Sequence, residues 1–231
     1  MLRVIGNDQN LPRQEHAVAS GTLTNGTPVV VNSDGTVSVV SGNDAGSGTA
    51  EVFESDYVTY TAAAYDVNAQ KVVVAYQDNN GGTGNAVVGT ITGTSISFGT
   101  PVVFENATTT YVAIAYDANA QKVVIAYRDG GNSNSGTAIV GTVSGTSISF
   151  GSPTVFESVN STYIKIAYDS TSQKVIISYR DNGNSDYGTA IVGTVSGTSI
   201  SFGSAAVFDT TTVDWTSVAY DPNANKIAIG S

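Results

Sequence analysis

The sequence contains no cysteine and a single histidine, and these absences exclude several kinds of site. Without cysteine there is neither a disulfide framework nor a thiolate metal site. His16 lies between Glu15 and Ala17 in a polar stretch, where a solvated imidazole is expected. No serine–histidine–acid arrangement can be assembled around it. We therefore expect a protein that is not an enzyme and that needs no cofactor or metal.

Charge is also scarce, and what there is has the wrong sign for nucleic acid. Only 12% of the residues are charged, and the formal net charge is −10. Nine scattered lysines and arginines cannot offset phosphate charge, which argues against a nucleic-acid partner. No apolar stretch is long enough for a signal peptide or a membrane span. The sequence therefore predicts a soluble protein that does not insert into membranes.

The chain does contain a block of residues that recurs with a nearly identical sequence. A tyrosine–aspartate pair marks each copy at intervals of 51, 52 and 52 residues: Tyr65-Asp66, Tyr116-Asp117, Tyr168-Asp169 and Tyr220-Asp221. A second series keeps the same interval: Phe53, Phe104, Phe156 and Phe208. A period of this size indicates a repeat architecture, in which each copy folds as one unit and packs on its neighbours.

Each copy reads as four strands separated by turns. In residues 103–154 the expected strands are Thr110 to Asp117, Lys122 to Asp129, GTAIVGTVSG and SISFGSPTVFE. The first two are apolar on both faces, so both faces must be covered. The fourth alternates serine with isoleucine or phenylalanine, as expected of an outer strand with one wetter face. The pattern predicts an all-β fold, a β-propeller of four-stranded antiparallel blades.

The last copy is incomplete, which raises the question of how the propeller would close. The complete units are residues 52–102, 103–154 and 155–206, followed by a half-unit at 207–231. Residues 28–51, which contain two apolar runs around an Asn-Ser-Asp-Gly turn, would complete a fourth blade after a leader or attachment segment at 1–27. Two alternatives stay open: a piece of a larger propeller or repeat array, and another β arrangement such as a fibrous trimer.

The two ends of each predicted blade differ in how much they vary between copies. The turns after the first and third strands are nearly constant, as in DANAQK and SGTS. The loops after the second strand, such as RDGGNSNSGT and RDNGNSDYGT, and the connections between copies carry the polar variety. An antiparallel meander places both variable sets at one end. That end is the candidate recognition surface, since binding residues favour loops on a rigid scaffold; drift in unconstrained loops is the alternative.

Two columns of aspartate have structural and functional interpretations. The first opens the constant turn (Asp66, Asp117, Asp169 and Asp221), where a turn that bonds its own backbone is favoured over calcium binding. The second opens the variable loop (Asp78, Asp129 and Asp181), behind Arg128 and Arg180 in two copies. Bracing of the loop is favoured over binding of sugar hydroxyls. Glycoside hydrolysis needs two carboxylates with distinct roles, whereas these recur in equivalent surroundings.

Aromatic residues form the last candidate set. Tyr60, Tyr111, Tyr163 and Trp215 occupy one column, for which ring packing is favoured and carbohydrate stacking is the alternative. Tyr57 and Tyr187 are not repeated and lie in variable loops, so they are predicted to contact a ligand individually. The predicted ligand-binding residues are therefore Tyr57, Tyr187, Arg128, Arg180 and Trp215.

The repeat, as in AYDANAQKVVIAYRDGGNSNSGTAIVGTVSGTSISFGSPTVFE, resembles repeat regions of tail-fibre and other virion proteins of tailed bacteriophages, particularly phages of aquatic bacteria and cyanobacteria. The resemblance covers nearly the whole chain and is architectural, so it carries no catalytic residue. It implies a protein of the virion surface, a fibre, decoration or receptor-binding module. Its partners would be other virion proteins, further copies of itself and a host receptor or glycan. The alternative is a bacterial lectin-like adhesin, and a glycan hydrolase comes third.

Overall fold

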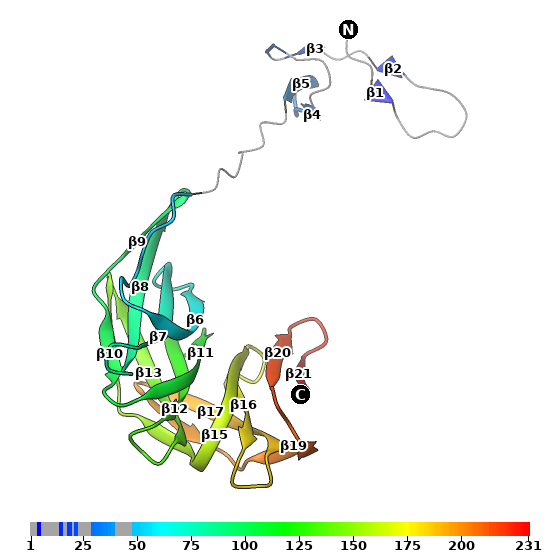
Figure 1. The fold of residues 1–231 in the computed structure, drawn as a ribbon. Coiled ribbons are helices and arrows are strands. Elements are labelled where there is room, and N and C mark those ends of the chain that lie inside the picture. The colour runs from blue at the N-terminus through cyan, green and yellow to red at the C-terminus, as the bar shows by residue number, and fades with distance from the viewer. Residues whose placement is uncertain (1–3, 6–13, 16–17, 20, 23–28, 40–47) are drawn as a thin grey trace. The chain divides into compact units, whose positions relative to one another are not determined.

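The computed structural model describes residues 4–5, 14–15, 18–19, 21–22, 29–39 and 48–231 (Figure 1). Every regular element in this part of the chain is a β-strand, which confirms the all-β prediction. The chain divides into two compact units, residues 1–47 and 48–231, whereas the sequence placed the boundary after residue 27. Within the described ranges no helix has the length and apolarity of a membrane span. His16 lies outside the described residues.

The N-terminal unit contains short strands. β1 (Val4–Ile5) pairs with β2 (Gln14–Glu15), and a second sheet has the order β3-β5-β4, formed by β3 (Val18–Ala19), β5 (Thr36–Val39) and β4 (Val29–Val31). β4 and β5 form the hairpin predicted around the Asn-Ser-Asp-Gly turn. Gly35 has a φ of 79°, and the Asp34 carboxylate accepts hydrogen bonds from the backbone N and Oγ1 of Thr36 at 2.9 and 2.7 Å.

Residues 48–231 fold into three successive antiparallel meanders and a final hairpin. The strands of the first meander (58–105) are β6 (Val58–Asp66), β7 (Lys71–Asp78), β8 (Gly84–Thr92), β9 (Ser95–Phe98) and β10 (Val102–Glu105). The second (109–157) has β11 (Thr109–Asp117), β12 (Lys122–Asp129), β13 (Ser135–Ser144), β14 (Ser147–Phe150) and the start of β15 (Thr154–Asp169). The third (161–212) has the rest of β15, β16 (Lys174–Asp181), β17 (Tyr187–Ser196), β18 (Ser199–Phe202) and β19 (Ala206–Thr212). The C-terminal hairpin (217–230) has β20 (Ser217–Asp221) and β21 (Lys226–Gly230).

The predicted strands match these bounds closely, except for the fourth. SISFGSPTVFE is broken at Gly151–Pro153 into two pieces, β14 and the start of β15, and both pair with β13. Proline has no N–H to donate to the ladder, so it suits a break in an outer strand. β15 then continues into the third meander, which is why strands of two meanders belong to one hydrogen-bonded sheet.

The meanders stack face to face, and this stacking buries the strands that are apolar on both faces, as predicted. Val123, Ile125 and Tyr127 on β12 pack against the first meander, while Val124 and Ala126 pack against the third; all five are 0% exposed. Side chains alternate along a strand, so a central meander needs cover on both faces and receives it. The same arrangement forms two core clusters, one at each junction between meanders.

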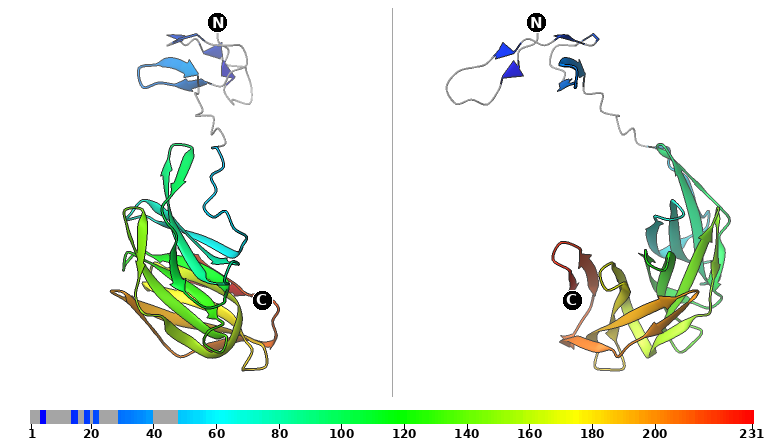
Figure 2. Two further views of the ribbon diagram at one scale, coloured as in Figure 1. Left: turned by 60° about the vertical axis from the view of Figure 1, so that its left-hand side comes forward. Right: turned by 180° about the vertical axis from the view of Figure 1, so that it is seen from behind.

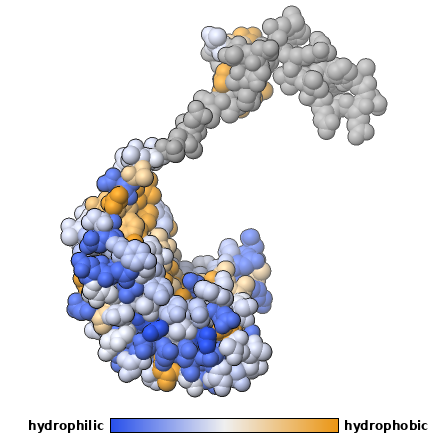
Figure 3. All heavy atoms as spheres, viewed as in Figure 1, coloured by the Kyte–Doolittle hydropathy of each residue, from blue (hydrophilic) through white to orange (hydrophobic). Residues whose placement is uncertain are grey.

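The stacking curves residues 48–231 into an arc, with the first strand of each meander on its concave side (Figure 2). Consecutive first strands are in contact, β6 with β11, β11 with β15, and β15 with β20. Hydrophilic residues cover most of the face seen in Figure 3, but an apolar patch lies over β8 and β9, where Ile91 is 52% exposed. The arc ends at the β20–β21 hairpin, whose strands pair only with each other among the described residues.

The sequence predicts that residues 28–51 complete the last blade. In the described part of that segment, β4 pairs with β5, and β5 also pairs with β3. Residues 40–47, which also belong to the segment expected to close the ring, lie outside the described residues.

Candidate functional site

The variable loops and the connections between meanders meet at one end of residues 48–231, as the sequence predicts. Each loop after a second strand exchanges backbone hydrogen bonds with a neighbouring connection, at 2.8 to 3.2 Å: Asn79 N to Tyr57 O, Thr109 N to Gly82 O, Gly130 N to Thr108 O, Ser161 N to Asn134 O, Asn182 N to Asn160 O and Val213 N to Asp186 O. These bonds satisfy backbone groups that a free loop leaves to water. The loops and connections of the variable end are therefore held together by backbone hydrogen bonds.

The opposite end consists of tight turns held by their own aspartates. The Asp117 carboxylate accepts hydrogen bonds from the backbone N of Asn119 and Ala120 at 3.0 and 2.9 Å. Asp169 and Asp221 repeat both bonds, and Asp66 keeps the one from Ala69 N. The Tyr168 hydroxyl accepts a bond from Asn119 N at 3.1 Å, which ties one meander to the turn of the previous one. The turn interpretation of this column is confirmed. Across the described ranges no group of three or more metal-ligating side chains of His, Cys, Asp or Glu gathers.

A β-bulge near the start of each first strand sets the direction of the column of tyrosines. The register shifts between Thr59 and Ala62 in β6, and the same shift occurs in β11 and β15. At these bulges Tyr60, Tyr111 and Tyr163 have φ of 50°, 53° and 54°. A bulky residue seldom adopts this left-handed backbone, which glycine usually supplies. The bulge therefore points an aromatic ring where a regular strand would not.

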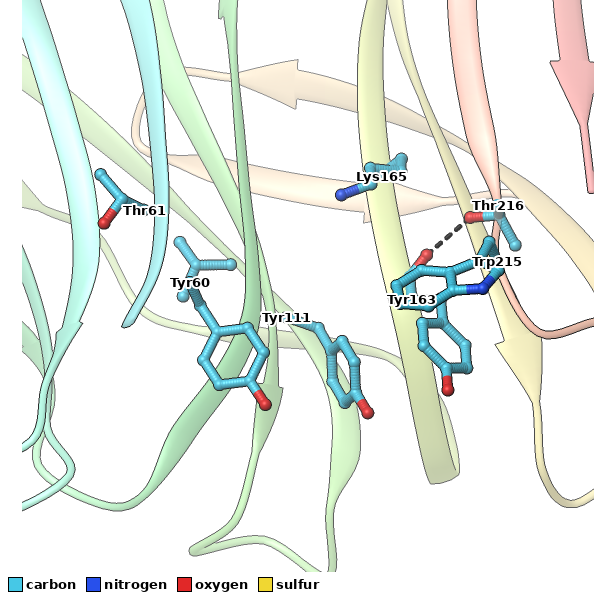
Figure 4. A pocket seen from close by; sticks show the side chains of 8 residues that line it. Tyr60, Thr61, Tyr111, Tyr163, Lys165, Trp215 and Thr216 are labelled. Carbon is cyan, nitrogen blue, oxygen red and sulfur yellow. Dashed lines mark hydrogen bonds between the residues drawn. The ribbon is translucent and has the colours of Figure 1, made fainter. Parts of the chain in front are cut away.

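The rings of the column form a continuous ladder across four copies of the repeat. Ring centroids are 5.2 Å apart from Tyr60 to Tyr111, 5.2 Å from Tyr111 to Tyr163 and 4.9 Å from Tyr163 to Trp215, all tilted or edge to face (Figure 4). Thr216 anchors the tryptophan, because its Oγ1 donates to the backbone oxygen of Tyr163 at 2.6 Å. Ring packing, the favoured interpretation of the column, is confirmed.

The ladder also lines a cavity of about 180 Å³. Its walls come from the first strands of all three meanders and from the approach to β20: Tyr60, Thr61, Tyr111, Val112, Tyr163, Lys165, Trp215 and Thr216. Tyr60 is 41% exposed and Trp215 is 71% exposed, so the two ends of the ladder present ring surface to solvent. Small-molecule sites in proteins are concave, mostly apolar and supplied with a few polar groups, and this cavity has that composition.

Two arginines near the ends of β12 and β16, directly before the variable loops, lie over the ladder. The Arg128 guanidinium is 5.8 Å from the ring centroid of Tyr111, and that of Arg180 is 5.9 Å from the ring centroid of Tyr163. Arg128 donates through Nε and Nη2 to Asn134 Oδ1 at 3.0 and 2.9 Å. Arg180 pairs with Asp186 at 2.6 Å and with Asp214 at 3.6 Å. Cation–π contact and loop bracing thus coincide at these arginines.

The aspartates of the variable loops brace them, as predicted. Asp129 accepts from the backbone N of Gly131 and Asn132 at 2.9 and 3.1 Å, and Asp181 accepts from Gly183 N at 2.9 Å. The first meander has Gln77 where the others have arginine. Its Oε1 accepts a 2.8 Å bond from Thr59, so that loop is held without a cation.

Electrostatics favour the neutral form of the Tyr111 phenol and the charged form of Arg180. Burial raises the pKa of Tyr111, and the neighbouring Tyr163 and Tyr60 raise it further against the opposing effect of Arg128. The hydrogen bond from Arg180 lowers the pKa of Asp186, and that bond raises the pKa of Arg180. At neutral pH the cavity therefore offers a phenol that can donate a hydrogen bond beside a fixed guanidinium.

The structure brings together three of the five predicted ligand-binding residues. Trp215 lines the cavity, and Arg128 and Arg180 lie over the ladder rings without being among the lining residues. Tyr57 and Tyr187 are not among the lining residues either. Tyr57 is 73% exposed, and Tyr187 lies at the start of β17. Sequence reasoning missed Lys165. The available signal was its departure from the alanine that the first two copies have at that position, Ala62 and Ala113.

No protein-family model matches the chain, and no curated protein matches it closely enough to count as a relative. The geometry of the site thus stands on its own.

Proposed function

We propose that this protein is a non-enzymatic, carbohydrate-binding module and that the aromatic ladder at the variable end is its binding site. One observation carries the proposal: four aromatic rings from four successive copies line a single cavity beside the variable loops. Three of these rings stand on a left-handed backbone, which costs about 1–3 kcal/mol each. Strained backbone clusters at binding sites, although in this chain the constant turns also carry it, at Gln70, Gln121, Gln173 and Asn225.

The chemistry of the cavity suits a saccharide. An aromatic ring offers an apolar face to the C–H face of a sugar, and its hydroxyl or indole N–H supplies a polar edge. The exposed rings at both ends of the ladder, Tyr60 and Trp215, are in position for such contact. The arginines and amide side chains of the adjacent loops supply hydrogen bonds for sugar hydroxyls.

A glycan array probed with the full-length chain tests this proposal. We expect binding to a restricted set of glycans, which calorimetry then reproduces in solution. Failure to bind any glycan on an array that covers bacterial surface saccharides would contradict it.

We place this module on the surface of a virion, as a fibre, decoration or receptor-binding protein of a tailed bacteriophage. The support is the resemblance of the repeat to such proteins, together with a variable end opposite a constant one. Its partners would be a host-surface glycan, other virion proteins and further copies of itself. Gene neighbourhood tests this placement: adjacent capsid or tail genes are expected.

A lectin-like adhesin of a bacterium is the second candidate, and the same aromatic site favours it equally. A neighbouring secretion system, or an anchoring domain on the same gene, would establish the adhesin and overturn the virion placement.

We further propose that the meanders are blades of a four-bladed propeller whose last blade is completed by residues 28–51. The exposed ends of the arc support this. Val192 on β17 is 46% exposed, although its counterparts Val88 and Val140 are 0% exposed beneath the next meander. β4 is an edge strand of its described sheet, with Val30 and Val31 50% and 66% exposed. Hydrogen exchange tests closure: protection of 217–230 should fall when residues 1–47 are deleted, and unchanged protection counts against it.

A further inference from the structure

Lys165 breaks the repeat at the point where the chain faces the cavity. The other copies have Ala62, Ala113 and Ser217 in its place. It lies on β15, opposite Ser178 on β16, is exposed, and lines the cavity. In Figure 4 its ammonium group points away from Thr216 and toward the strand that carries Thr61. One copy of the repeat thus adds a positive charge to a wall that is otherwise aromatic, aliphatic and hydroxylic.

Within the part of the chain that the structure describes, the ammonium group of Lys165 has no carboxylate partner. Among the described residues the ion pairs within 4.0 Å are those of Arg180 with Asp186 and Asp214. Arg128 is held by Asn134, so both arginines are already engaged. The three N–H donors of Lys165 are therefore available to a ligand.

The distribution of basic residues also sets this end apart. Residues 48–231 contain seven lysines and arginines, and four of them repeat at the constant turn: Lys71, Lys122, Lys174 and Lys226. The other three are Arg128, Arg180 and Lys165, and all three lie at the ladder. In a chain with a net charge of −10, this is a local gathering of cations. Asp214 and Asp186 offset Arg180, which leaves Lys165 as the cation of the cavity wall without an anionic partner.

We infer that the cavity binds an acidic saccharide, with the anionic group of the sugar on Lys165 and the sugar ring against the tyrosines and Trp215. This inference rests on the proposed function and adds the class of ligand to it. The anionic group is a carboxylate, as in a uronic acid, or a sulfate ester, since both accept charge-assisted hydrogen bonds from an ammonium group. A hydrogen bond to a charged group contributes about 1.5–3 kcal/mol, which corresponds to roughly 10- to 150-fold in affinity.

The repeat itself provides the matched variants for a test. Lys165→Ala installs the residue that the first two copies carry at this position, so it should fold normally, and circular dichroism checks this. Lys165→Arg keeps the charge. Calorimetry on the full-length chain would compare uronic acid hexasaccharides, their carboxyl-reduced neutral counterparts and sulfated neutral hexasaccharides.

The wild-type protein should prefer at least one acidic probe over its neutral counterpart by about tenfold or more, and added salt should weaken the preference. Lys165→Ala should abolish the preference, so that the acidic and neutral probes bind with equal affinity, and Lys165→Arg should retain most of the preference. The acidic probe that binds with higher affinity shows whether the anionic group is a carboxylate or a sulfate ester. Equal affinity for acidic and neutral probes, or a preference that survives in Lys165→Ala, would overturn the inference while the carbohydrate-binding function stands. Failure of all probes together with a blank glycan array would overturn both.

Discussion

At the scale of single residues, the molecule uses aromatic side chains in two different ways. Tyr76, Tyr127 and Tyr179 are 0% exposed, and their hydroxyls donate to Glu54, Glu105 and Glu157 at 3.1 to 3.2 Å. Of the ladder rings, by contrast, the three tyrosines stand on bulges of the first strands, and the two end rings, Tyr60 and Trp215, are exposed to solvent. Tyr127 and Tyr179 lie in the core clusters between meanders and Tyr76 lies in the core of the first meander, whereas the ladder set is free to meet a ligand. Substitutions in the two sets should therefore have separable effects.

Trp215→Ala should affect binding more than stability. The indole is 71% exposed and contacts Tyr163 at 4.9 Å, so its loss should lower the free energy of unfolding by about 0.5–1.5 kcal/mol. Affinity for a bound glycan should fall about tenfold or more, the usual cost of a stacking anchor. Tyr57→Ala is the matched control, because Tyr57 is 73% exposed and lies outside the cavity wall. Calorimetry and urea denaturation measure both; equal loss of affinity in the two variants would place the site elsewhere.

Alkaline pH should destabilise the fold through the buried tyrosines. Burial, assisted by the charge of Glu105, raises the pKa of Tyr127 above its ordinary value of 10.0, and Tyr179 behaves in the same way. A raised pKa in the folded state means that the contribution is fully present below pH 10.0 and is lost as the pH rises above it. The free energy of unfolding should therefore decline above about pH 10.

Tyr127→Phe is the control for this pH effect. The variant should lose about 1 kcal/mol at neutral pH with the hydrogen bond to Glu105, but it should decline less steeply in alkali. Urea denaturation across the pH range, with tyrosinate followed by ultraviolet absorbance, measures both quantities. An equal alkaline slope in wild type and variant would show that other groups control the transition.

At the scale of elements, the outer strand of each meander is fitted to the turn of the next. The glycine that breaks the strand lies directly on a backbone oxygen: a Cβ at Gly99 would be 1.9 Å from Thr146 O, and one at Gly151 would be 1.9 Å from Thr198 O. The third meander lacks this contact, because the hairpin that follows it carries no second copy of the SGTS turn. At Gly203 a Cβ would meet nothing closer than Val192 O at 3.9 Å.

Gly151→Ala should therefore destabilise the protein, and Gly203→Ala should not. Overpacking against a backbone atom costs about 1–3 kcal/mol. Gly203→Ala should change the free energy of unfolding by less than about 0.5 kcal/mol, as surface substitutions usually do. Thermal and urea denaturation of the two variants check the difference. A neutral Gly151→Ala variant would contradict the close approach of the second and third meanders.

At the scale of the whole molecule, the question is what covers the last apolar face. Val140 and Val192 occupy the same position in consecutive copies, yet the first is 0% and the second 46% exposed. Introducing a threonine hydroxyl into a covered apolar face costs about 1–3 kcal/mol, whereas an exposed position tolerates it. The pair of positions thus reports whether a fourth blade is complete in solution.

Under the proposed closure, Val192→Thr should cost about as much as Val140→Thr in the full-length chain. In a chain that starts at residue 48, the cost of Val192→Thr should fall below about 0.5 kcal/mol, while that of Val140→Thr persists. Urea denaturation of the four proteins measures this. A negligible cost of Val192→Thr in the full-length chain would mean that residues 28–51 do not cover this face.

The sequence by itself determined the features that depend on near neighbours along the chain. Period-two alternation and turn residues specify strands such as Lys122–Asp129, the Asp34–Gly35 hairpin and the aspartate-held turns, because these depend on local backbone geometry. Strands with apolar residues on both faces also required that the meanders stack, because both faces of such a strand must be covered. The split of the outer strand and the bulges were not predicted, since nothing in the local pattern marks a left-handed tyrosine. Only the tertiary structure decided the site. Stacking brings rings about fifty residues apart in the chain to 5 Å, and the curvature of the arc places Tyr60, Lys165 and Trp215 around one cavity.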